Sequence, residues 1–188
     1  MNLNLIKIFK KKNTKGFTLM EVIIALFIFA VGIIAIYVMT TFTISSTIHV
    51  SNKFTAAYLV QEGIELVRNI RDTNWLQGTG HTWNEQLATF NCNGTCDEVI
   101  NGCIVDYKHS YSPLTPEDPD LPAYNGQFLN IDSDVFYSYS AGSQTKFKRK
   151  VSIDASTADI LKVCVRVEWK EKGNPNQITA QENLYNWR

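Results

Sequence analysis

An uninterrupted apolar run near the N-terminus constrains the fold of this chain more than any other feature. After Glu21 no Asp, Glu, Lys or Arg occurs before Lys53, and residues 22–39 are mostly Phe, Ile, Leu, Val and Ala. About 20 such residues cross a bilayer as a helix. Five lysines and no acidic residue precede the run: Lys7, Lys10, Lys11, Lys12 and Lys15. This charge bias keeps a segment on the cytoplasmic side, so we expect everything after the run to face outward.

Glu21 makes the run unusual, because a carboxylate in a membrane-spanning helix disfavours insertion by about 2.5–3.5 kcal/mol. Two ordinary interpretations account for it poorly. A cleaved secretory signal could end at the small residues 30–32, but cleavage there would leave the apolar residues 33–39 as the new terminus. An uncleaved single-span anchor explains the lysines and the apolar run and gives Glu21 no role.

The residues around Glu21 carry a resemblance to a known processing signal. The sequence Gly-Phe-Thr-Leu-Met-Glu at residues 16–21, behind a basic leader and ahead of an apolar helix, resembles the class III signal peptide of type IV prepilins and type II secretion pseudopilins. The resemblance implies that a prepilin peptidase cleaves between Gly16 and Phe17 and that the new Phe17 amine is methylated. It further implies retention of the apolar run, and partners that include other pilin or pseudopilin subunits and an inner-membrane assembly platform.

A processed N-terminus would give Glu21 a role. Glu21 lies four residues beyond Phe17, one helical turn away on the same face. Opposite charges about 4 Å apart attract by about 4 kcal/mol at an effective dielectric near 20, which is comparable to the cost of placing the carboxylate in an apolar helix. In the family that the motif resembles, the corresponding glutamate meets the N-terminal amine of an adjacent subunit, which implies an assembly contact for Glu21.

The N-terminal helix is expected to continue beyond the membrane. No proline occurs before Pro113, and from Thr47 onward apolar residues recur at spacings of three and four. They are Phe54, Ala57, Leu59, Val60, Ile64, Val67 and Ile70. This pattern predicts one helix that ends around residues 72–74, and the polar pair at residues 45–46 leaves open two separate helices. Many pilins have a proline at the position of Val38, which this chain lacks.

The C-terminal residues 146–188 predict a small antiparallel sheet. Apolar and polar residues alternate over 147–153 and, more clearly, over 161–170, with turn residues at 155–159 and 172–176 and a third strand over 178–184. Such a meander would cover the apolar stripe of the helix, which predicts an α+β fold with a long N-terminal helix packed on a small antiparallel sheet. The C-terminal residues also look like minor pilins of the PilV type and related pseudopilins, a looser resemblance than the first.

Five segments follow from these patterns. They are a cleaved basic leader at 1–16, a transmembrane and fibre-core half of the helix at 17–44, an amphipathic half at 45–72, a variable loop region at 73–145 and the sheet at 146–188. Within the loop region we expect a short helix around residues 84–90 that turns Trp75, Trp83, Leu87 and Phe90 inward. The proline-containing residues 112–122 are expected to be extended, and any specific recognition should reside in the loop region.

The even number of cysteines predicts disulfides, because the chain beyond the membrane would lie in an oxidising compartment. The candidates are Cys92, Cys96, Cys103 and Cys164. Cys164 lies on the polar face of its strand, so we favour one bridge within the first three and one bridge to Cys164. A zinc site and free buried thiols remain alternatives, although the cysteine spacing lacks paired Cys-x2-Cys motifs.

Metal binding and catalysis find little support. The pairs Asp118 with Asp120 and Asp132 with Asp134 could ligate calcium, but neither has EF-hand spacing, so we expect solvated turns and no metal or cofactor.

The three histidines stand in unrelated contexts: His49, His81 and His109. No phosphate-binding glycine loop and no nucleophile with a base at motif spacing occurs, so we expect no enzyme.

Charge gives no sign of nucleic-acid binding. The chain has 18 basic and 18 acidic residues, and removal of the five leader lysines leaves 13 basic residues and a mature net charge of −5. The cluster Lys146, Lys148, Arg149 and Lys150 is interpreted as a solvated strand edge.

The sequence as a whole predicts a minor type IV pilin. We expect a single-pass protein of the inner membrane with its C-terminal head outside the cytoplasm, which then enters a pilus or pseudopilus filament. Two alternatives remain: a minor pseudopilin of a type II secretion system, and a membrane-anchored extracytoplasmic binding module that does not polymerise. The sequence leaves open the machine that is served, the position in a filament and any adhesive ligand.

Overall fold

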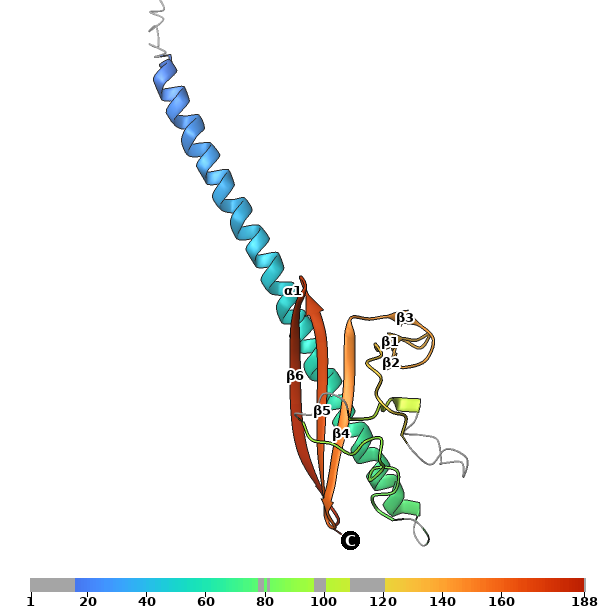
Figure 1. Cartoon of the computed structure of the whole chain (residues 1–188). Helices are drawn as coiled ribbons and strands as arrows, with labels where there is room; N and C mark the ends of the chain where they lie inside the picture. The colour runs from blue at the N-terminus through green and yellow to red at the C-terminus, as the bar shows by residue number, and fades with distance from the viewer. Residues whose placement is uncertain (1–15, 78–79, 81, 97–100, 109–120, 188) are drawn as a thin grey trace, which may run out of the picture. The chain divides into compact units, whose positions relative to one another are not determined.

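A computed structural model describes residues 16–77, 80, 82–96, 101–108 and 121–187. The chain divides into two compact units, Met1–Thr47 and Ile48–Arg188. In its described part the first unit contains the apolar first portion of one long helix. The second unit, called the head below, contains the rest of that helix and all the strands (Figure 1). The expected leader lies outside the described residues except for Gly16.

The helix α1 runs from Leu19 to Gln77. It continues through Ser45 and Ser46, so the two-helix alternative does not apply. It ends three residues beyond the expected limit of 72–74. The absence of proline permits this length, since proline would remove a backbone hydrogen bond and clash with the preceding turn.

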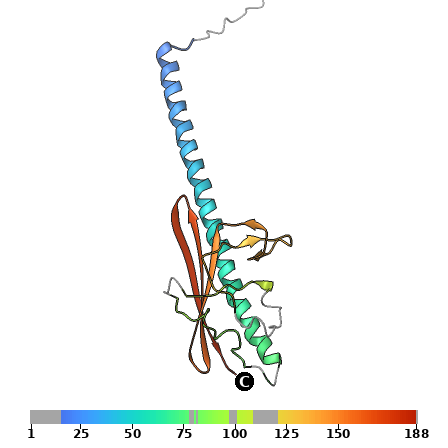
Figure 2. The same ribbon diagram turned by 45° about the vertical axis from the view of Figure 1, so that its right-hand side comes forward.

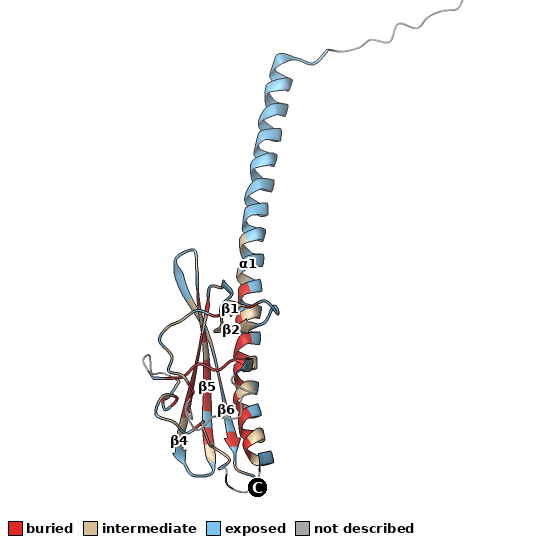
Figure 3. Cartoon of the chain, turned by 90° about the vertical axis from the view of Figure 1, so that its right-hand side faces the viewer, coloured by how far each residue is buried: buried red, intermediate tan, exposed pale blue. Residues whose placement is uncertain are grey.

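One side of α1 is buried within the head, and its phase differs from the expected one. Leu59, Val60, Ile64, Val67 and Ile70 are buried as predicted, together with other residues of the stripe: Asn52, Ala56, Gly63, Arg71 and Asn74 (Figure 3). The prediction for Phe54 and Ala57 is wrong, since both are exposed. Helical periodicity places them off the stripe that Asn52, Ala56 and Leu59 define, because 3.6 residues make one turn.

The head contains the predicted three-stranded antiparallel meander. It consists of β4 (Phe147–Thr157), β5 (Ile160–Glu171) and β6 (Asn174–Tyr185) in the order β4-β5-β6 (Figures 1 and 2). Val151 pairs with Val165 across β4 and β5, and Val165 pairs with Ala180 across β5 and β6. Two short hairpins connect the strands, so each strand follows its neighbour in the chain. The α+β class and the long helix with a small sheet are therefore confirmed.

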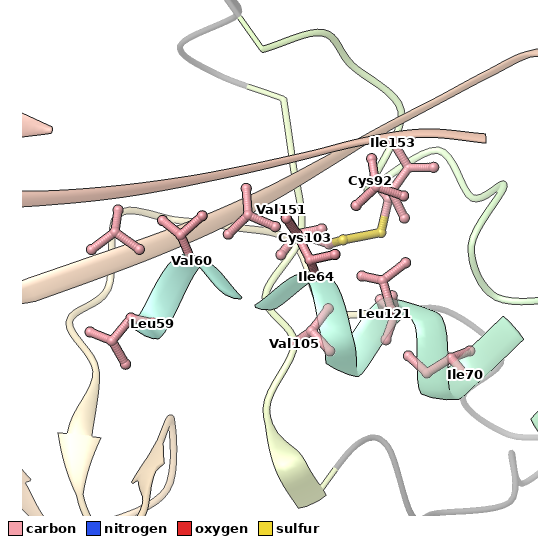
Figure 4. Close-up of a cluster of buried hydrophobic side chains, with 14 of the residues drawn as sticks. Leu59, Val60, Ile64, Ile70, Cys92, Cys103, Val105, Leu121, Val151 and Ile153 are labelled. Carbon is pink, nitrogen blue, oxygen red and sulfur yellow. A yellow bond between two sulfur atoms is a disulfide. The ribbon is translucent and has the colours of Figure 1, made fainter. Parts of the chain in front are cut away.

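The core lies between the head part of α1 and one face of this sheet. Alternate residues of β4 and β5 face it, as the period of two requires. Its buried members include Val151, Ile153, Leu161, Val163, Val165, Val167, Trp169 and Leu184. Figure 4 shows Cys92 and Cys103, joined by a disulfide, beside Ile64 of α1 and Val151 of β4. The loop region at residues 73–145, called the middle segment below, therefore contributes to the core and is more than a surface loop.

The free edge of β4 is covered by the middle segment. Val151 exchanges two backbone hydrogen bonds with Cys103, and Ile153 N–H donates to the carbonyl of Cys92. The interpretation of residues 146–150 as a solvated strand edge is therefore wrong for two members, since Arg149 is fully buried and Lys150 is 4 % exposed. Lys146 is exposed and Lys148 half-buried.

A second small sheet lies in the region expected to be loop. It is formed by β1 (Asn130–Ile131), β2 (Tyr137–Ser138) and β3 (Ser143–Gln144), all antiparallel, in the order β2-β1-β3. Strands of two residues have no hydrophobic period, so no sequence pattern predicts them.

The expected helix around residues 84–90 is absent. Hydrogen-bonded turns occupy the segment, with Leu87 N–H and Ala88 N–H both donating to the carbonyl of Asn84. Gln86 has a φ of 66°, a left-handed conformation that interrupts a helix. Leu87 points inward as expected and is fully buried, whereas Phe90 is 92 % exposed. The inward prediction for Phe90 is therefore wrong.

Candidate processing and assembly site

Thr18 caps the beginning of α1. The backbone N–H of Glu21 donates to Thr18 Oγ1 at 3.3 Å, and the N–H of Val22 donates to the Thr18 carbonyl at 3.2 Å. A Thr at the N-cap with a Glu three residues later is the pattern of a capping box. Glu21 also lies in the first turn, where a negative charge is favoured by the partial positive charge of the helix N-terminus.

Gly16 and Phe17 precede the cap and therefore lie outside the helix. Both are exposed, with Phe17 at 81 %. A Cβ atom placed on Gly16 would have no atom within 4 Å. Packing within the described chain thus gives no reason for a glycine here, and the peptide bond between Gly16 and Phe17 is accessible from solvent.

The surface of α1 that follows Glu21 is apolar and uncovered. Side chains from Val22 to Ile44 are exposed on all sides of the helix, for example Phe27 at 69 % and Ile36 at 69 %. The segment is long and apolar enough to cross a membrane. In the described part of the chain no cation forms an ion pair with Glu21. The carboxylate thus stands at the start of an apolar surface that needs other molecules to cover it.

A membrane-anchored protein of pilin-like α+β arrangement is the class that these features define. Residues 11–37 match the family model described as the prokaryotic N-terminal methylation motif. The match covers the expected processing signal and the first part of the apolar helix, and this arrangement fits the N-terminal region of type IV prepilins and pseudopilins. Comparisons with curated proteins and with solved structures found no match.

Two disulfides fix the middle segment to the sheet. One joins Cys92 to Cys103 in the core, and the other joins Cys96 to Cys164 on the sheet face that points away from α1. One bridge is thus local and the other reaches the central strand β5. The described residues contain no free cysteine and no group of three His, Cys, Asp or Glu side chains that could hold a metal ion.

Asp132 of the middle region organises a turn. Asp132 accepts hydrogen bonds from the N–H groups of Asp134 and Phe136 and from the hydroxyl of Tyr107 at 2.6 Å. The Tyr107 hydroxyl lowers the pKa of Asp132, and the same contact raises the pKa of Tyr107 to about 12. Both oxygens of Asp132 thus have protein partners, and the side chain is buried, so the expectation of a solvated turn is wrong for Asp132. Asp134 is exposed as expected. The other candidate pair, Asp118 with Asp120, lies outside the described residues.

Of the three histidines, His49 is described, and it joins α1 to the β5–β6 hairpin. Its Nδ1 lies 2.9 Å from Oε2 of Glu171, the last residue of β5. This contact, with further contributions from Asn52 and Trp169, lowers the pKa of Glu171. His81 and His109 lie outside the described residues.

The sequence patterns did not reveal the role of Arg149. It is fully buried, donates to the carbonyls of Leu59 and Val105, and pairs with Glu62 at 3.2 Å. It thereby joins β4, α1 and the middle segment. The alternation in β4 assigns Arg149 to the core face of the strand. This was a signal for its role, because an ionic group is seldom buried without partners.

Proposed function

We propose that this chain is a minor subunit of a type IV pilus or pilus-like filament. In this proposal a prepilin peptidase cleaves between Gly16 and Phe17, and the Phe17 amine is then methylated. The single observation that supports it best is the position of the Thr18 cap, which leaves the Gly16–Phe17 bond outside the helix and exposed.

Glu21 would act after processing. Cleavage places an ammonium group on Phe17 at the edge of the apolar surface, and the Glu21 carboxylate one turn away lacks a partner within the described chain. In a filament the amine of an adjacent subunit would supply that partner while the apolar surfaces cover each other. Such a pair at about 4 Å would contribute about 4 kcal/mol at an effective dielectric near 20, enough to select one axial register.

The proposal divides the chain by task. Residues 17–44 would form the fibre core and the membrane anchor before assembly, and residues 45–72 would support the head. Residues 146–188 would complete the core of the head, and residues 73–145 would carry whatever distinguishes this subunit from others. Location in the inner membrane before assembly, and the partners named above, belong to the same proposal.

Mass spectrometry of the mature protein tests the processing step. We expect an N-terminal peptide that begins with methylated Phe17 when the chain is produced together with a prepilin peptidase. A Gly16→Val variant should stay uncleaved, because the structure gives residue 16 no packing role and the glycine therefore serves the peptidase. A mature protein that retains Met1 or Asn2 would instead favour the non-polymerising anchored module.

Filament incorporation tests Glu21. Glu21→Ala should leave membrane insertion intact or improved and should abolish incorporation into filaments. Glu65→Ala is the matched control, since Glu65 is an exposed acid on the same helix within the head. Equal incorporation of the two variants would refute the pairing role. Co-purification with secretion-system rather than pilus subunits would identify the chain as a minor pseudopilin.

A further inference from the structure

The outer face of the main sheet has an open hollow beside the β5–β6 hairpin. Its volume is about 770 Å³. Six side chains matter for what it could bind: Phe128, Lys146, Lys148, Glu168, Lys170 and Gln177. Elsewhere this face carries the Cys96–Cys164 bridge, and at the hairpin end Phe128 of the middle segment lines one side of the hollow.

The hollow is basic with one aromatic wall. Lys148 Nζ lies 4.5 Å from the centroid of the Phe128 ring, a cation–π contact that holds the ammonium group at the rim. Lys146 and Lys170 are exposed and add two more positive charges. Glu168 is the one acidic side chain among the described lining residues, and it lies opposite Lys148 in the strand register. The hollow therefore has an excess of two positive charges.

This excess contrasts with the mature chain as a whole, whose net charge is −5. Along the head part of α1 the exposed Lys53 comes first, and Glu62, Glu65 and Asp72 follow together with Arg68 and Arg71. The hollow at the hairpin end of the head thus carries a local excess of positive charge. An anionic ligand or surface at that end would be attracted although the whole protein is acidic.

The connection to the membrane segment is short. Lys170 precedes Glu171, whose carboxylate contacts His49, and His49 follows Ile44 by five residues. Five residues span at most about 18 Å when extended and about 7.5 Å as a helix. The headgroup region extends about 5–7 Å beyond the hydrocarbon on each side of a bilayer. Chain length alone therefore places His49 within about 18 Å of the end of the apolar run, and a continued helix would place it about 7.5 Å away, at the outer limit of the headgroup layer.

We propose that this hollow binds the headgroup of an anionic phospholipid in the leaflet on the side of the head. The lysines contact the phosphate, and the Phe128 wall lies against the glycerol backbone and the first acyl carbons. This contact holds the head against the membrane while the subunit is anchored there. The inference depends on membrane anchorage and not on filament assembly, so failure of the filament proposal would leave it intact.

Amine labelling of the full chain in vesicles tests the proposal. The chain is reconstituted into vesicles of phosphatidylcholine alone or with phosphatidylglycerol, treated with a membrane-impermeant amine reagent and digested with a protease that does not cut at lysine. Lys162 is the internal control, because it is exposed at the opposite end of β5. Labelling is expressed relative to Lys162, which cancels differences in vesicle orientation.

We expect phosphatidylglycerol to lower the relative labelling of Lys146, Lys148 and Lys170 about fivefold or more, since one lysine near an anionic surface gains about that factor in association. Equal labelling in both vesicles would overturn the proposal. Equal protection of all head lysines, measured against an added free peptide, would show non-specific adsorption and would also overturn it. Protection by inorganic phosphate in phosphatidylcholine vesicles would identify a free anion as the ligand and overturn the lipid assignment.

Variants supply a second measurement. Native mass spectrometry of the detergent-solubilised chain should show phosphatidylglycerol adducts that Lys146→Gln/Lys148→Gln/Lys170→Gln reduces at least fivefold. Lys162→Gln should leave the adducts unchanged. Equal adducts in both variants would overturn the role of the hollow. The labelling comparison needs only the unaltered protein, so it stands even if the triple variant misfolds.

Discussion

Gly63 of α1 lies so close to Val165 of β5 that a Cβ atom on Gly63 would come within 2.8 Å of Val165 Cγ1. The same Cβ would lie 3.3 Å from Cδ of Arg149. A side chain at position 63 would therefore have to push the helix away from the sheet. Glycine normally weakens a helix interior by about 1 kcal/mol relative to alanine, and here it permits a close approach of the two layers.

Gly63→Ala should destabilise the head. Overpacking of a tight core costs about 1–3 kcal/mol, and the gain in helix propensity of about 1 kcal/mol offsets only part of it. Urea unfolding of the detergent-solubilised chain, followed by near-ultraviolet circular dichroism, measures the difference. Gly32→Ala is the control, because a Cβ there meets nothing within 4 Å. If the urea midpoint of Gly63→Ala equals or exceeds that of Gly32→Ala, then α1 can move away from the sheet without loss of stability.

Arg149→Ala should lower the free energy of unfolding by more than the substitution of any exposed charged residue in the head does. It removes donors from the carbonyls of Leu59 and Val105 and leaves a cavity, and truncation of one partner of a buried charge network costs about 3–5 kcal/mol. Because Glu62 is partly exposed and can be rehydrated, we expect a value at the lower end. Urea unfolding of the detergent-solubilised chain gives the free energy of unfolding.

Two further variants are controls: one separates charge from volume at position 149, and the other removes an exposed arginine elsewhere in the head. Arg149→Met keeps most of the buried stem and should lose less stability than Arg149→Ala. Arg68→Ala removes a partly exposed arginine that pairs with Glu65 and Glu182, so its effect should stay within about 1 kcal/mol. Equal losses for Arg149→Ala and Arg68→Ala would mean that the buried contacts contribute little.

Regular periodicity explains which parts of the fold could be predicted from the sequence. Helical spacing gave α1 and most of its buried stripe, and strict alternation gave β4 and β5 with their faces. Both signals arise because one side of an element faces the core over many residues. The motif at residues 16–21 pointed to the proposed class because it is a local sequence pattern that can be identified without knowledge of the fold.

The remaining features depend on contacts between distant segments. Nothing local shows that Lys150 is buried beneath Gly102, or that Arg149 reaches the carbonyl of Val105. The left-handed φ of Gln86 overrides local helix propensity, which is a weak determinant in a short segment. For the candidate site, the residue types at 16–21 were visible, whereas the Thr18 cap that leaves the Gly16–Phe17 bond exposed needed the structure.

Acid should destabilise the head through Asp132. The Tyr107 hydroxyl and two backbone N–H groups favour the carboxylate, so the folded-state pKa lies below the unfolded value of about 4. The resulting stability is complete above the unfolded pKa and is lost as the pH falls through the folded pKa. Asp132→Asn should therefore lower stability at neutral pH and flatten its fall below pH 4.

Thermal unfolding of the full chain in detergent between about pH 2 and pH 7 measures this dependence. Asp134→Asn removes an exposed carboxylate from the same turn and is the control. Tyr107→Phe, which removes the donor and keeps the ring, should reproduce part of the Asp132→Asn effect. If the acid limb keeps the same slope in Asp132→Asn as in the control, other carboxylates determine it.

Removal of the two disulfides should destabilise the head unequally. Cys92 and Cys103 are 11 residues apart, and Cys96 and Cys164 are 68 apart. Restricting the unfolded chain over these loops contributes about 3 and about 4 kcal/mol respectively in the chain-entropy description. The Cys92–Cys103 bridge is also fully buried at both ends, so its replacement by serines adds the cost of burying hydroxyl groups. We therefore expect Cys92→Ala/Cys103→Ala to lower the free energy of unfolding by less than Cys96→Ala/Cys164→Ala does. Cys92→Ser/Cys103→Ser should lower it by more than Cys92→Ala/Cys103→Ala does. Urea unfolding of the four double variants gives the order. An alanine pair at 92 and 103 that costs more than the pair at 96 and 164 would show that core packing around the local bridge outweighs loop entropy.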